Sequence, residues 1–160
     1  MPNDNLVKIL FNFYSDILDK QTNETMWAEV VDASKGYYRI DNIPFYVPVL
    51  ASGDVVFAEY DNDQLMLTYR ETIEYSGNST IHIIIMDEEL EIATLVEIFD
   101  EMGCPSEGMN GNYLALEIPF NMDYIPVKRK LDQMEKDEVI GYAETCLSEN
   151  HQYKDFQFPS

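Results

Sequence analysis

The first half of the chain alternates apolar and polar positions in short runs, which is typical of antiparallel strands with one buried face. The runs that predict strands are 8–14, 25–31, 37–40, 54–60 and 65–73. Residues 6–18 would also accommodate a short helix, but we favour the strand because the run is apolar and aromatic. Several short strands joined by tight turns predict a small antiparallel β-barrel or a rolled sheet.

The stretch 24–56 organises this half of the chain. It contains Trp27, the only tryptophan, and we expect its segments, including 42–46, to be strands that close a small sheet. The large ring of Trp27 would be buried there, with Phe45 and Val55 among its neighbours.

A polar turn at residues 76–80 marks a change of periodicity. Residues 81–86 are almost continuously apolar, as in a central strand that is buried on both faces. The acidic residues 87–89 then open a predicted helix, where their charges would meet the positive end of the helix dipole. The apolar stripe of this helix faces inward, and Gly103 ends the helix in the left-handed conformation.

A further strand at 112–118 precedes a second helix, which begins at Asp123 or Tyr124, and a last strand covers 140–147. The inward stripe of the second helix is expected to be Val127, Leu131 and Met134. Its exposed side carries the basic run 128–130. The order strand, helix, strand, helix, strand predicts a ferredoxin-like βαβαβ half in which two helices cover one face of a sheet.

These elements predict an α+β protein with a subdomain boundary at 74–78. Residues 1–75 would form the β-rich, barrel-like subdomain, and residues 76–160 the ferredoxin-like subdomain on which it packs. The tail, 151–160, contains three aromatic residues beside a proline. We therefore expect this tail to dock or bind rather than to move freely.

Charge is the outlying property of the sequence. The chain has 30 acidic and 10 basic residues, for a formal net charge of −20. No lysine or arginine occurs in residues 71–127, although this span is rich in aspartate and glutamate. Such a surface repels nucleic-acid phosphates and anionic membranes and favours basic partners. The alternative interpretation is a solvated acidic surface that only keeps the protein soluble.

The chain is long enough, at 160 residues with 46% hydrophobic residues, to bury a real core. It shows no apolar run of membrane-spanning length, and its first residues lack the pattern of a signal peptide. We therefore expect a cytoplasmic protein. In a reducing compartment, Cys104 and Cys146 are expected to be buried thiols.

Few residues suggest chemistry. Two widely separated histidines and two isolated cysteines form no recognisable zinc pattern, and the acidic clusters lack the glycine and terminal glutamate of a calcium loop. We expect no metal and no cofactor. His82 lies in a predicted buried strand and is expected to be a hydrogen-bonded core residue. For an enzyme, Cys104 or Cys146 would be the nucleophile, or Glu24 and Glu29 the acid and base.

One polar constellation forms a candidate ligand pocket between the two subdomains. Its residues are Glu24, Trp27, Asn42, Ser76, Asn78, Ser79 and Thr80. The structural alternative is that these hydroxyl, amide and carboxyl groups cap turns and satisfy backbone groups.

Several of these motifs resemble the signature of an uncharacterised bacterial family: E-T-x-W-A-E, N-I-P-F-Y, G-D-V-V and S-G-N-S-T. They occur here at 24–29, 42–46, 53–56 and 76–80, and the resemblance spans roughly residues 6–148. The family has no established role, so the resemblance implies a shared fold. Similar members carry a basic residue soon after S-G-N-S-T, where this chain has His82.

The leading functional hypothesis is a binding protein that neutralises a basic protein, such as an immunity protein or an inhibitor of a toxin or nucleic-acid enzyme. The expected contact residues are Asp87, Glu88, Glu89, Glu91, Glu97, Asp100 and Glu101. The alternative is a small-molecule-binding or regulatory module that uses the candidate pocket. We expect no enzymatic activity, no nucleic-acid partner and no membrane partner, and the sequence leaves the oligomeric state open.

Overall fold

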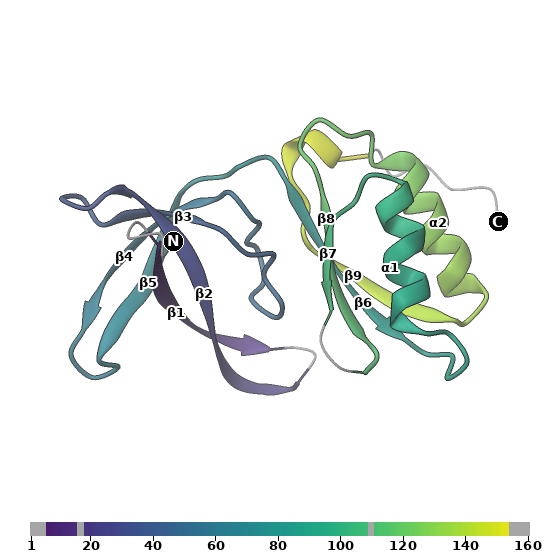
Figure 1. Cartoon of the computed structure of the whole chain (residues 1–160), viewed down its shortest axis with the longest axis horizontal. Coiled ribbons are helices and arrows are strands. Elements are labelled where there is room, and N and C mark those ends of the chain that lie inside the picture. The colour runs from purple at the N-terminus through teal and green to yellow at the C-terminus, as the bar shows by residue number, and fades with distance from the viewer. Residues whose placement is uncertain (1–5, 16–17, 109–110, 154–160) are drawn as a thin grey trace. The chain divides into compact units, whose positions relative to one another are not determined.

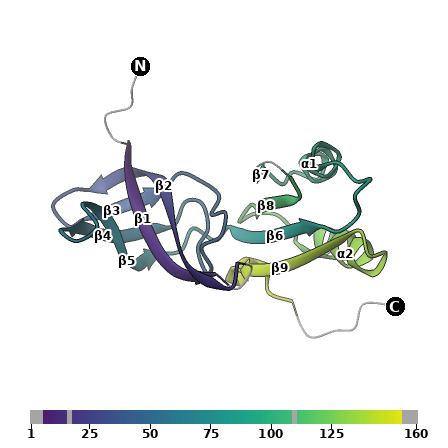
Figure 2. The ribbon, with the colours of Figure 1, turned by 90° about the horizontal axis from the view of Figure 1, so that it is seen from below.

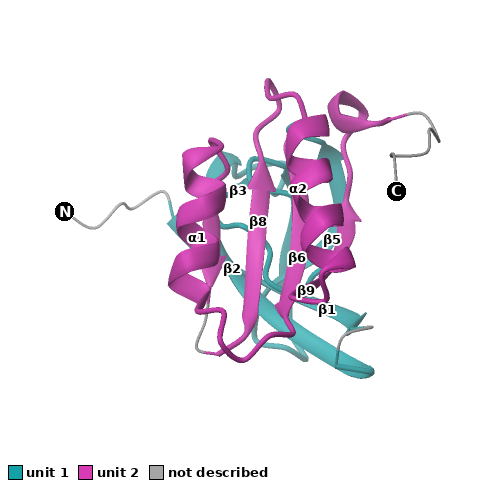
Figure 3. Ribbon diagram, turned by 90° about the vertical axis from the view of Figure 1, so that its right-hand side faces the viewer, with its two compact units in different colours: residues 1–76 teal, residues 77–160 magenta. Residues whose placement is uncertain are grey.

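The computed structural model describes residues 6–15, 18–108 and 111–153 (Figure 1). The chain divides into two compact units, Met1–Ser76 (unit 1) and Gly77–Ser160 (unit 2), which Figure 3 shows in different colours. Unit 1 contains one β-sheet, and unit 2 contains a second β-sheet with two α-helices among its described residues. The predicted α+β class is confirmed.

Unit 1 is a sheet that closes on itself. Its strands are β1 (Leu6–Ser15), β2 (Lys20–Asp32), β3 (Tyr37–Ile40), β4 (Val55–Asp61) and β5 (Met66–Glu74). Each strand pairs antiparallel with the next, and β1 pairs with β5 in parallel at Leu10 and Thr68, which completes the ring. The strand prediction for residues 8–14 is confirmed, and the helical alternative is wrong.

The interior of the ring is filled by alternate residues of its strands. Ile9 and Phe11 of β1 face Met26 and Ala28 of β2 within one apolar cluster. Trp27 lies between these two inward positions, so its side chain points outward and is 45% exposed. The prediction that Trp27 is buried is therefore wrong. Its ring lies instead on the outer surface, where Lys8 Nζ is 5.0 Å from the ring centroid.

The segment between β3 and β4 is an irregular loop, so the prediction of a strand at 42–46 is also wrong. This loop is apolar because it helps to fill the ring. Val47 and Leu50 belong to the interior cluster, and Ile43 and Phe45 are buried as well. The prolines at 44 and 48 lack a backbone N–H, which makes continuous strand pairing unfavourable here.

Unit 2 places both of its helices on one face of a four-stranded sheet (Figure 3). Its elements are β6 (Ser79–Ile85), α1 (Ile92–Glu101), β7 (Ser106–Gly108), β8 (Tyr113–Ile118), α2 (Ile125–Lys136), β9 (Ile140–Cys146) and the 3₁₀ turn η1 (Glu149–His151). The strands lie in the order β7-β8-β6-β9, all antiparallel, as Figure 2 shows from another side. Strand β7 is absent from the predicted βαβαβ order, because three residues including a glycine carry no alternating pattern.

The core of unit 2 lies between this sheet and the helices. Ile81 and Ile83 of β6 pack in one cluster with Leu95 and Phe99 of α1. From α2, the cluster includes Val127, Leu131 and Met134, which confirms the predicted inward stripe. His82 points to the opposite face of the sheet because neighbouring strand residues alternate. It is nevertheless buried, with its ring centroid 5.6 Å from that of Tyr113.

The predicted start of α1 needs correction. Residues 87–89 precede the helix and form a turn, in which Asp87 Oδ1 accepts the backbone N–H of Glu89 at 2.9 Å. The first turn of α1 contains no acidic residue. The prediction that the acidic run begins the helix is wrong, because an aspartate side chain can accept a backbone N–H in a turn as well as at the start of a helix. Gly103, with φ of 92°, follows the end of α1 in the predicted left-handed conformation.

None of the described helices is long and apolar enough to cross a membrane. The first residues of the predicted tail, His151 and Tyr153, pack onto unit 2. Residues 154–160 lie outside the described part of the chain.

Candidate functional site

The carboxylate of Glu24 holds the β3–β4 loop in place. It lies on β2 and accepts the backbone N–H groups of Phe45, Tyr46 and Val47 at 2.8, 2.9 and 3.1 Å. Hydrogen bonds to an ionised acceptor are stronger than those between neutral groups. Three such bonds explain why an acid is needed at this position of the strand.

Asn42 and Asp54 fix the two ends of the same loop. Asn42 Oδ1 accepts the backbone N–H of Trp27 at 2.7 Å. Asp54 is fully buried, and its two oxygens accept the backbone N–H groups of Ala51 at 2.9 Å and Ser76 at 2.8 Å. Burial raises the pKa of Asp54 above its ordinary value, and these amide hydrogen bonds oppose the rise.

Of the candidate pocket residues in unit 1, Glu24, Trp27 and Asn42 thus come together around one loop. Ser76 lies at the last position of this unit, where its hydroxyl donates to the carbonyl of Ser52 at 2.8 Å. The polar groups of Glu24, Asn42 and Ser76 make contacts within unit 1. They satisfy backbone groups and fix a loop, as expected if these residues are structural and do not form a ligand pocket.

The candidate pocket residues of unit 2 line the start of β6. Asn78 Oδ1 accepts the backbone N–H of Phe120 at 2.8 Å. Ser79 is fully buried and accepts the backbone N–H of Ser148 at 2.8 Å. The carbonyl of Thr80 accepts the hydroxyl of Thr145 at 3.2 Å. The contacts of Ser79 and Thr80 tie β6 to β9 and to the turn that follows it, and the contact of Asn78 ties the start of β6 to the segment after β8.

A buried serine and a buried histidine join the η1 turn to β6. His151 Nε2 lies 2.9 Å from the carbonyl of Pro119, which can only accept, so this nitrogen carries the proton. Nδ1 therefore accepts from the hydroxyl of Ser79, at 2.6 Å. Burial lowers the pKa of His151, which favours the neutral ring. Because Ser79 has no exposed surface, the pair acts as a structural clamp rather than a nucleophile with its base.

The backbone conformation just before β6 requires a glycine at position 77. Its φ is 93°, and a Cβ atom there would lie 2.7 Å from Asn150 Nδ2 and 3.1 Å from Phe120 Cβ. We expect Gly77→Ala to lower the free energy of unfolding by about 1–2 kcal/mol, the strain of a left-handed alanine. Chemical denaturation would measure it. Gly141→Ala is the control, since a Cβ at Gly141 meets nothing within 4 Å; equal effects in both variants would contradict this account.

The structure corrects the predicted exposure of Lys128. Its side chain is only 12% exposed, and Nζ lies 3.3 Å from Asp132 Oδ1 and 4.0 Å from Glu144 Oε2. The same atom is 5.0 Å from the ring centroid of Tyr142 and 5.2 Å from that of Tyr153. Burial lowers the pKa of Lys128, but hydrogen bonding to Tyr142 and the nearby carboxylates outweigh it, so the pKa lies above its ordinary value. The amine therefore stays charged and is no nucleophile.

Glu144 connects Lys128 to the C-terminal segment. Its two oxygens accept the hydroxyls of Tyr124 at 2.6 Å and Tyr153 at 2.8 Å. Sequence reasoning missed this cluster. The only local signal was the pair Lys128 and Asp132, spaced four residues apart on one helix face.

The two cysteines are buried thiols, as predicted. Cys104 lies 3.4 Å from the sulfur of Met122, and burial raises its pKa to about 12. The thiol of Cys104 is therefore protonated at neutral pH and a poor nucleophile. Within residues 6–15, 18–108 and 111–153, no three His, Cys, Asp or Glu side chains come together to hold a metal ion.

The predicted acidic contact residues lie on the turn before α1 and on α1 itself. All of them are exposed except Asp87, which is half-buried. Over the described part of the chain, none of these carboxylates has an ion-pair partner. Glu97 faces the same side of α1 as Asp100 and Glu101, three and four residues later, and the last turn of the helix contains no basic residue. We call Glu97, Asp100 and Glu101 the α1 acidic face.

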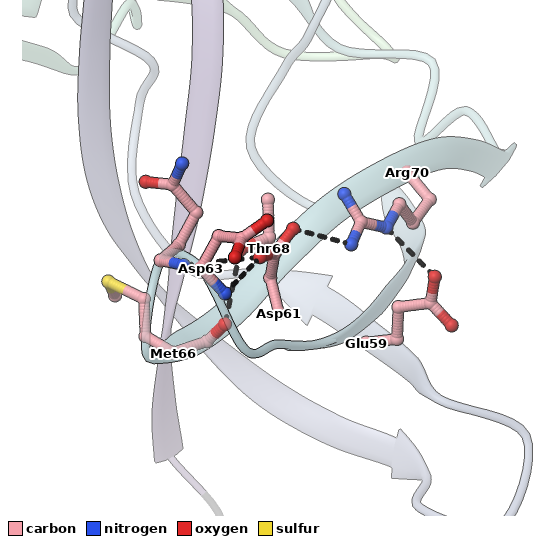
Figure 4. A network of polar contacts seen from close by, with 7 residues as sticks. Glu59, Asp61, Asp63, Met66, Thr68 and Arg70 are labelled. Carbon is pink, nitrogen blue, oxygen red and sulfur yellow. Dashed lines mark hydrogen bonds and ion pairs between the residues drawn. The ribbon is translucent and has the colours of Figure 1, made fainter.

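In unit 1, by contrast, the carboxylates of Glu59 and Asp61 are paired with Arg70 (Figure 4). Its guanidinium donates to Glu59 Oε1 and Asp61 Oδ2, each at 2.9 Å. Asp61 Oδ1 also accepts the backbone N–H of Asp63 at 2.8 Å. The bond to Arg70 holds the pKa of Asp61 below its ordinary value. The last basic residue before the basic-free span is thus already engaged by two carboxylates.

A hollow lies next to the acidic turn of unit 2. Its volume is about 420 Å³. It is lined by Ile85, Met86, Asp87, Glu88, Leu90, Gly111 and Asn112. The side chain of Met86 is 64% exposed. We call this feature the Met86 hollow; nothing in the sequence pattern indicated it, because its walls come from two separate segments.

Comparison with known proteins identifies a family without a known role. The chain matches a domain of unknown function (DUF4265) over residues 24–142. It is also similar to a hypothetical protein from Neisseria gonorrhoeae whose crystal structure is solved, with a TM-score of 0.75 and 26% sequence identity over 88% of this chain and 94% of that one. No curated protein matches the chain. The chain therefore belongs to the uncharacterised domain family DUF4265.

Proposed function

We propose that this chain is a binding protein of the cytoplasm that neutralises a basic protein, such as an immunity protein or an inhibitor of a toxin or nucleic-acid enzyme. The observation that carries the proposal is an exposed acidic surface without ion-pair partners among the described residues. It consists of the acidic residues that precede α1, at 87–91, and of the α1 acidic face. These carboxylates would meet the lysines and arginines with which such an enzyme holds phosphate. The protein would act by occupying that surface and not by catalysis.

The position of the α1 acidic face argues against solubility as its only purpose. Asp100 and Glu101 lie in the last turn of α1, at the negative end of the helix dipole. Each acid there destabilises the helix by about 0.3–1 kcal/mol. Solubility needs no particular position for its charges, whereas a contact surface does, so acids in an unfavourable position support a contact role.

Electrostatic steering gives this surface a kinetic role. Among described residues, unit 2 carries its lysines and arginines only on α2, and the span from residue 71 to 127 has none. A field of one sign over α1 accelerates encounter with an oppositely charged protein, and salt weakens the effect. Rapid, salt-sensitive capture suits a protein that must inactivate its target before damage occurs.

The architecture provides a rigid support for such a surface. The β-α-β-β-α-β order of unit 2 and its two helices on one face support a ferredoxin-like arrangement, in which β7 is the strand that the predicted βαβαβ order lacked. In the same way, the closed strand order of unit 1 supports a barrel-like arrangement. We favour protein binding over the small-molecule module because Glu24, Asn42 and Ser79 already make internal hydrogen bonds.

The experiment compares capture by three tagged proteins: the wild type, an α1 variant and a control. The α1 variant is Glu97→Gln, Asp100→Asn and Glu101→Gln. The control removes the same charge from exposed positions of unit 1, with Glu29→Gln, Glu71→Gln and Glu74→Gln. From native lysate, wild type and control should retain one basic protein at low salt and release it at high salt.

With that protein purified, the α1 variant should bind it at least about tenfold more weakly, a loss of roughly 1.4 kcal/mol. Neutralising acids at the end of α1 should also stabilise the helix, so lost binding cannot be attributed to unfolding. Equal affinity of the α1 variant and the control would overturn the proposal, and so would the absence of any basic protein in the wild-type capture.

A further inference from the structure

We propose that the Met86 hollow receives a single arginine side chain of the basic partner. This inference rests on the proposed function and extends it from a charged surface to a defined contact point. The hollow combines an apolar wall, available carboxylates and sufficient space.

The apolar wall suits the stem of a long cationic side chain. Met86 is 64% exposed, so its thioether is open to a partner. Ile85 and Leu90 line the same hollow. Arginine buries its methylene groups along apolar surface while its charged end seeks polar partners, and methionine adapts its shape to such a contact.

The carboxylates of the hollow have unused acceptor capacity. Asp87 Oδ1 accepts the N–H of Glu89, and Asp87 Oδ2 accepts no hydrogen bond from the described residues. Glu88 is exposed and likewise has no hydrogen-bond partner among them. A guanidinium has five donors in a planar fork that matches carboxylate oxygens, whereas an ammonium is a compact and strongly hydrated charge. This chemistry favours arginine over lysine.

Backbone hydrogen bonds fix the frame of the hollow. The N–H of Ile85 donates to the carbonyl of Asn112 at 2.7 Å, and the N–H of Met86 donates to that of Val139 at 2.8 Å. Asn112 Nδ2 also lies 3.4 Å from the carbonyl of Ile85. A site that is already formed loses less entropy on binding than one that must be ordered.

The charge of the hollow agrees with this occupant, and its volume is that of a ligand pocket. A volume of about 420 Å³ lies within the usual range of binding pockets, roughly 300–1,000 Å³. No lysine or arginine lines it. A carboxylate ligand would meet only like charge at Asp87 and Glu88, so charge complementarity selects a cation.

The probe for the test is a hexa-arginine peptide, with hexa-citrulline as its uncharged counterpart of similar shape. Calorimetry at low salt would measure affinity, and the methyl resonance of Met86, assigned with Met86→Leu, would report the place of binding. The hollow variant is Asp87→Asn with Glu88→Gln. Its matched control, Glu71→Gln with Glu74→Gln, removes the same charge from exposed positions of unit 1.

We expect hexa-arginine to shift the Met86 methyl resonance and hexa-citrulline to leave it unchanged. The hollow variant should bind hexa-arginine about tenfold more weakly, and the matched control less than about threefold more weakly. If hexa-arginine binds both variants equally weakly and does not shift the Met86 resonance, the inference that arginine enters the hollow is overturned. The proposal of a basic partner bound by charge would still stand. An equal Met86 shift and affinity with hexa-lysine would overturn the choice of arginine. Absence of binding would also overturn the inference, and the capture experiment would then decide the proposed function separately.

Discussion

Replacing Glu24 with alanine is expected to lower the free energy of unfolding of unit 1 by about 3 kcal/mol. The substitution removes the acceptor for the N–H groups of Phe45, Tyr46 and Val47. A hydrogen bond to a charged group contributes about 1.5–3 kcal/mol, and donors left unpaired carry a further penalty. Because Glu24 is only half-buried, water partly replaces the lost contacts, and the total stays below the sum of three full bonds.

Glu29→Ala is the matched control, since Glu29 lies on the same strand and is exposed. It should change the free energy of unfolding by less than about 0.5 kcal/mol. Trp27 is the only tryptophan, so its fluorescence during denaturation reports unit 1 selectively. If Glu24→Ala and Glu29→Ala denature at the same urea concentration, Glu24 does not hold the loop.

Replacing His151 with alanine is expected to destabilise unit 2 by about 3 kcal/mol at pH 7. The change leaves a cavity and removes the buried partner of Ser79 and of the Pro119 carbonyl. Hydrogen exchange of amides in β6 and β8 would measure the loss. Asn150→Ala in the same turn is exposed and should change stability by less than about 0.5 kcal/mol.

The effect of His151→Ala should shrink as the pH falls. Burial holds the pKa of His151 below that of the unfolded chain, so the unfolded state binds the extra proton first. The stabilising contribution of His151 is therefore complete above about pH 6.5 and declines below it, by at most about 1.4 kcal/mol per pH unit. Nearby titratable groups are Tyr124, whose ring centroid lies 6.0 Å away, and Glu144, bonded to Tyr124. A difference between wild type and His151→Ala that is constant from pH 7 to pH 5 would contradict this account.

The strands other than β7 and the α1 and α2 helices were predictable because their patterns are local. Alternation along residues 37–40 and the continuous apolar run at 81–86 follow directly from which faces are buried. The loop between β3 and β4 was not predictable, because Ile43, Phe45 and Val47 alternate as strand residues do although they are buried in an irregular loop. Trp27 was misplaced because size alone does not decide burial, whereas the inward positions of Met26 and Ala28 do.

The contacts of the candidate site were harder to predict, because they join distant parts of the chain. Ser79 and His151 are far apart in sequence, and no spacing rule links a strand start to a terminal turn. Likewise, the basic run predicts an exposed Lys128, yet Glu144 and two tyrosines from later segments lie around it. The acidic contact residues were easier to select, since exposed charge on a helix surface follows from the apolar stripe on its other side.

The parallel pairing of β1 with β5 has a consequence for folding order. Neighbouring strands of unit 1 can pair as soon as each hairpin exists, but Leu10 must wait for Thr68. Such a non-local contact requires a large loop to close, which makes it a late and slow step. During synthesis, the edge of β1 therefore stays open until β5 leaves the ribosome. That interval, and not the finished ring, is when this chain is most exposed to pairing with other chains.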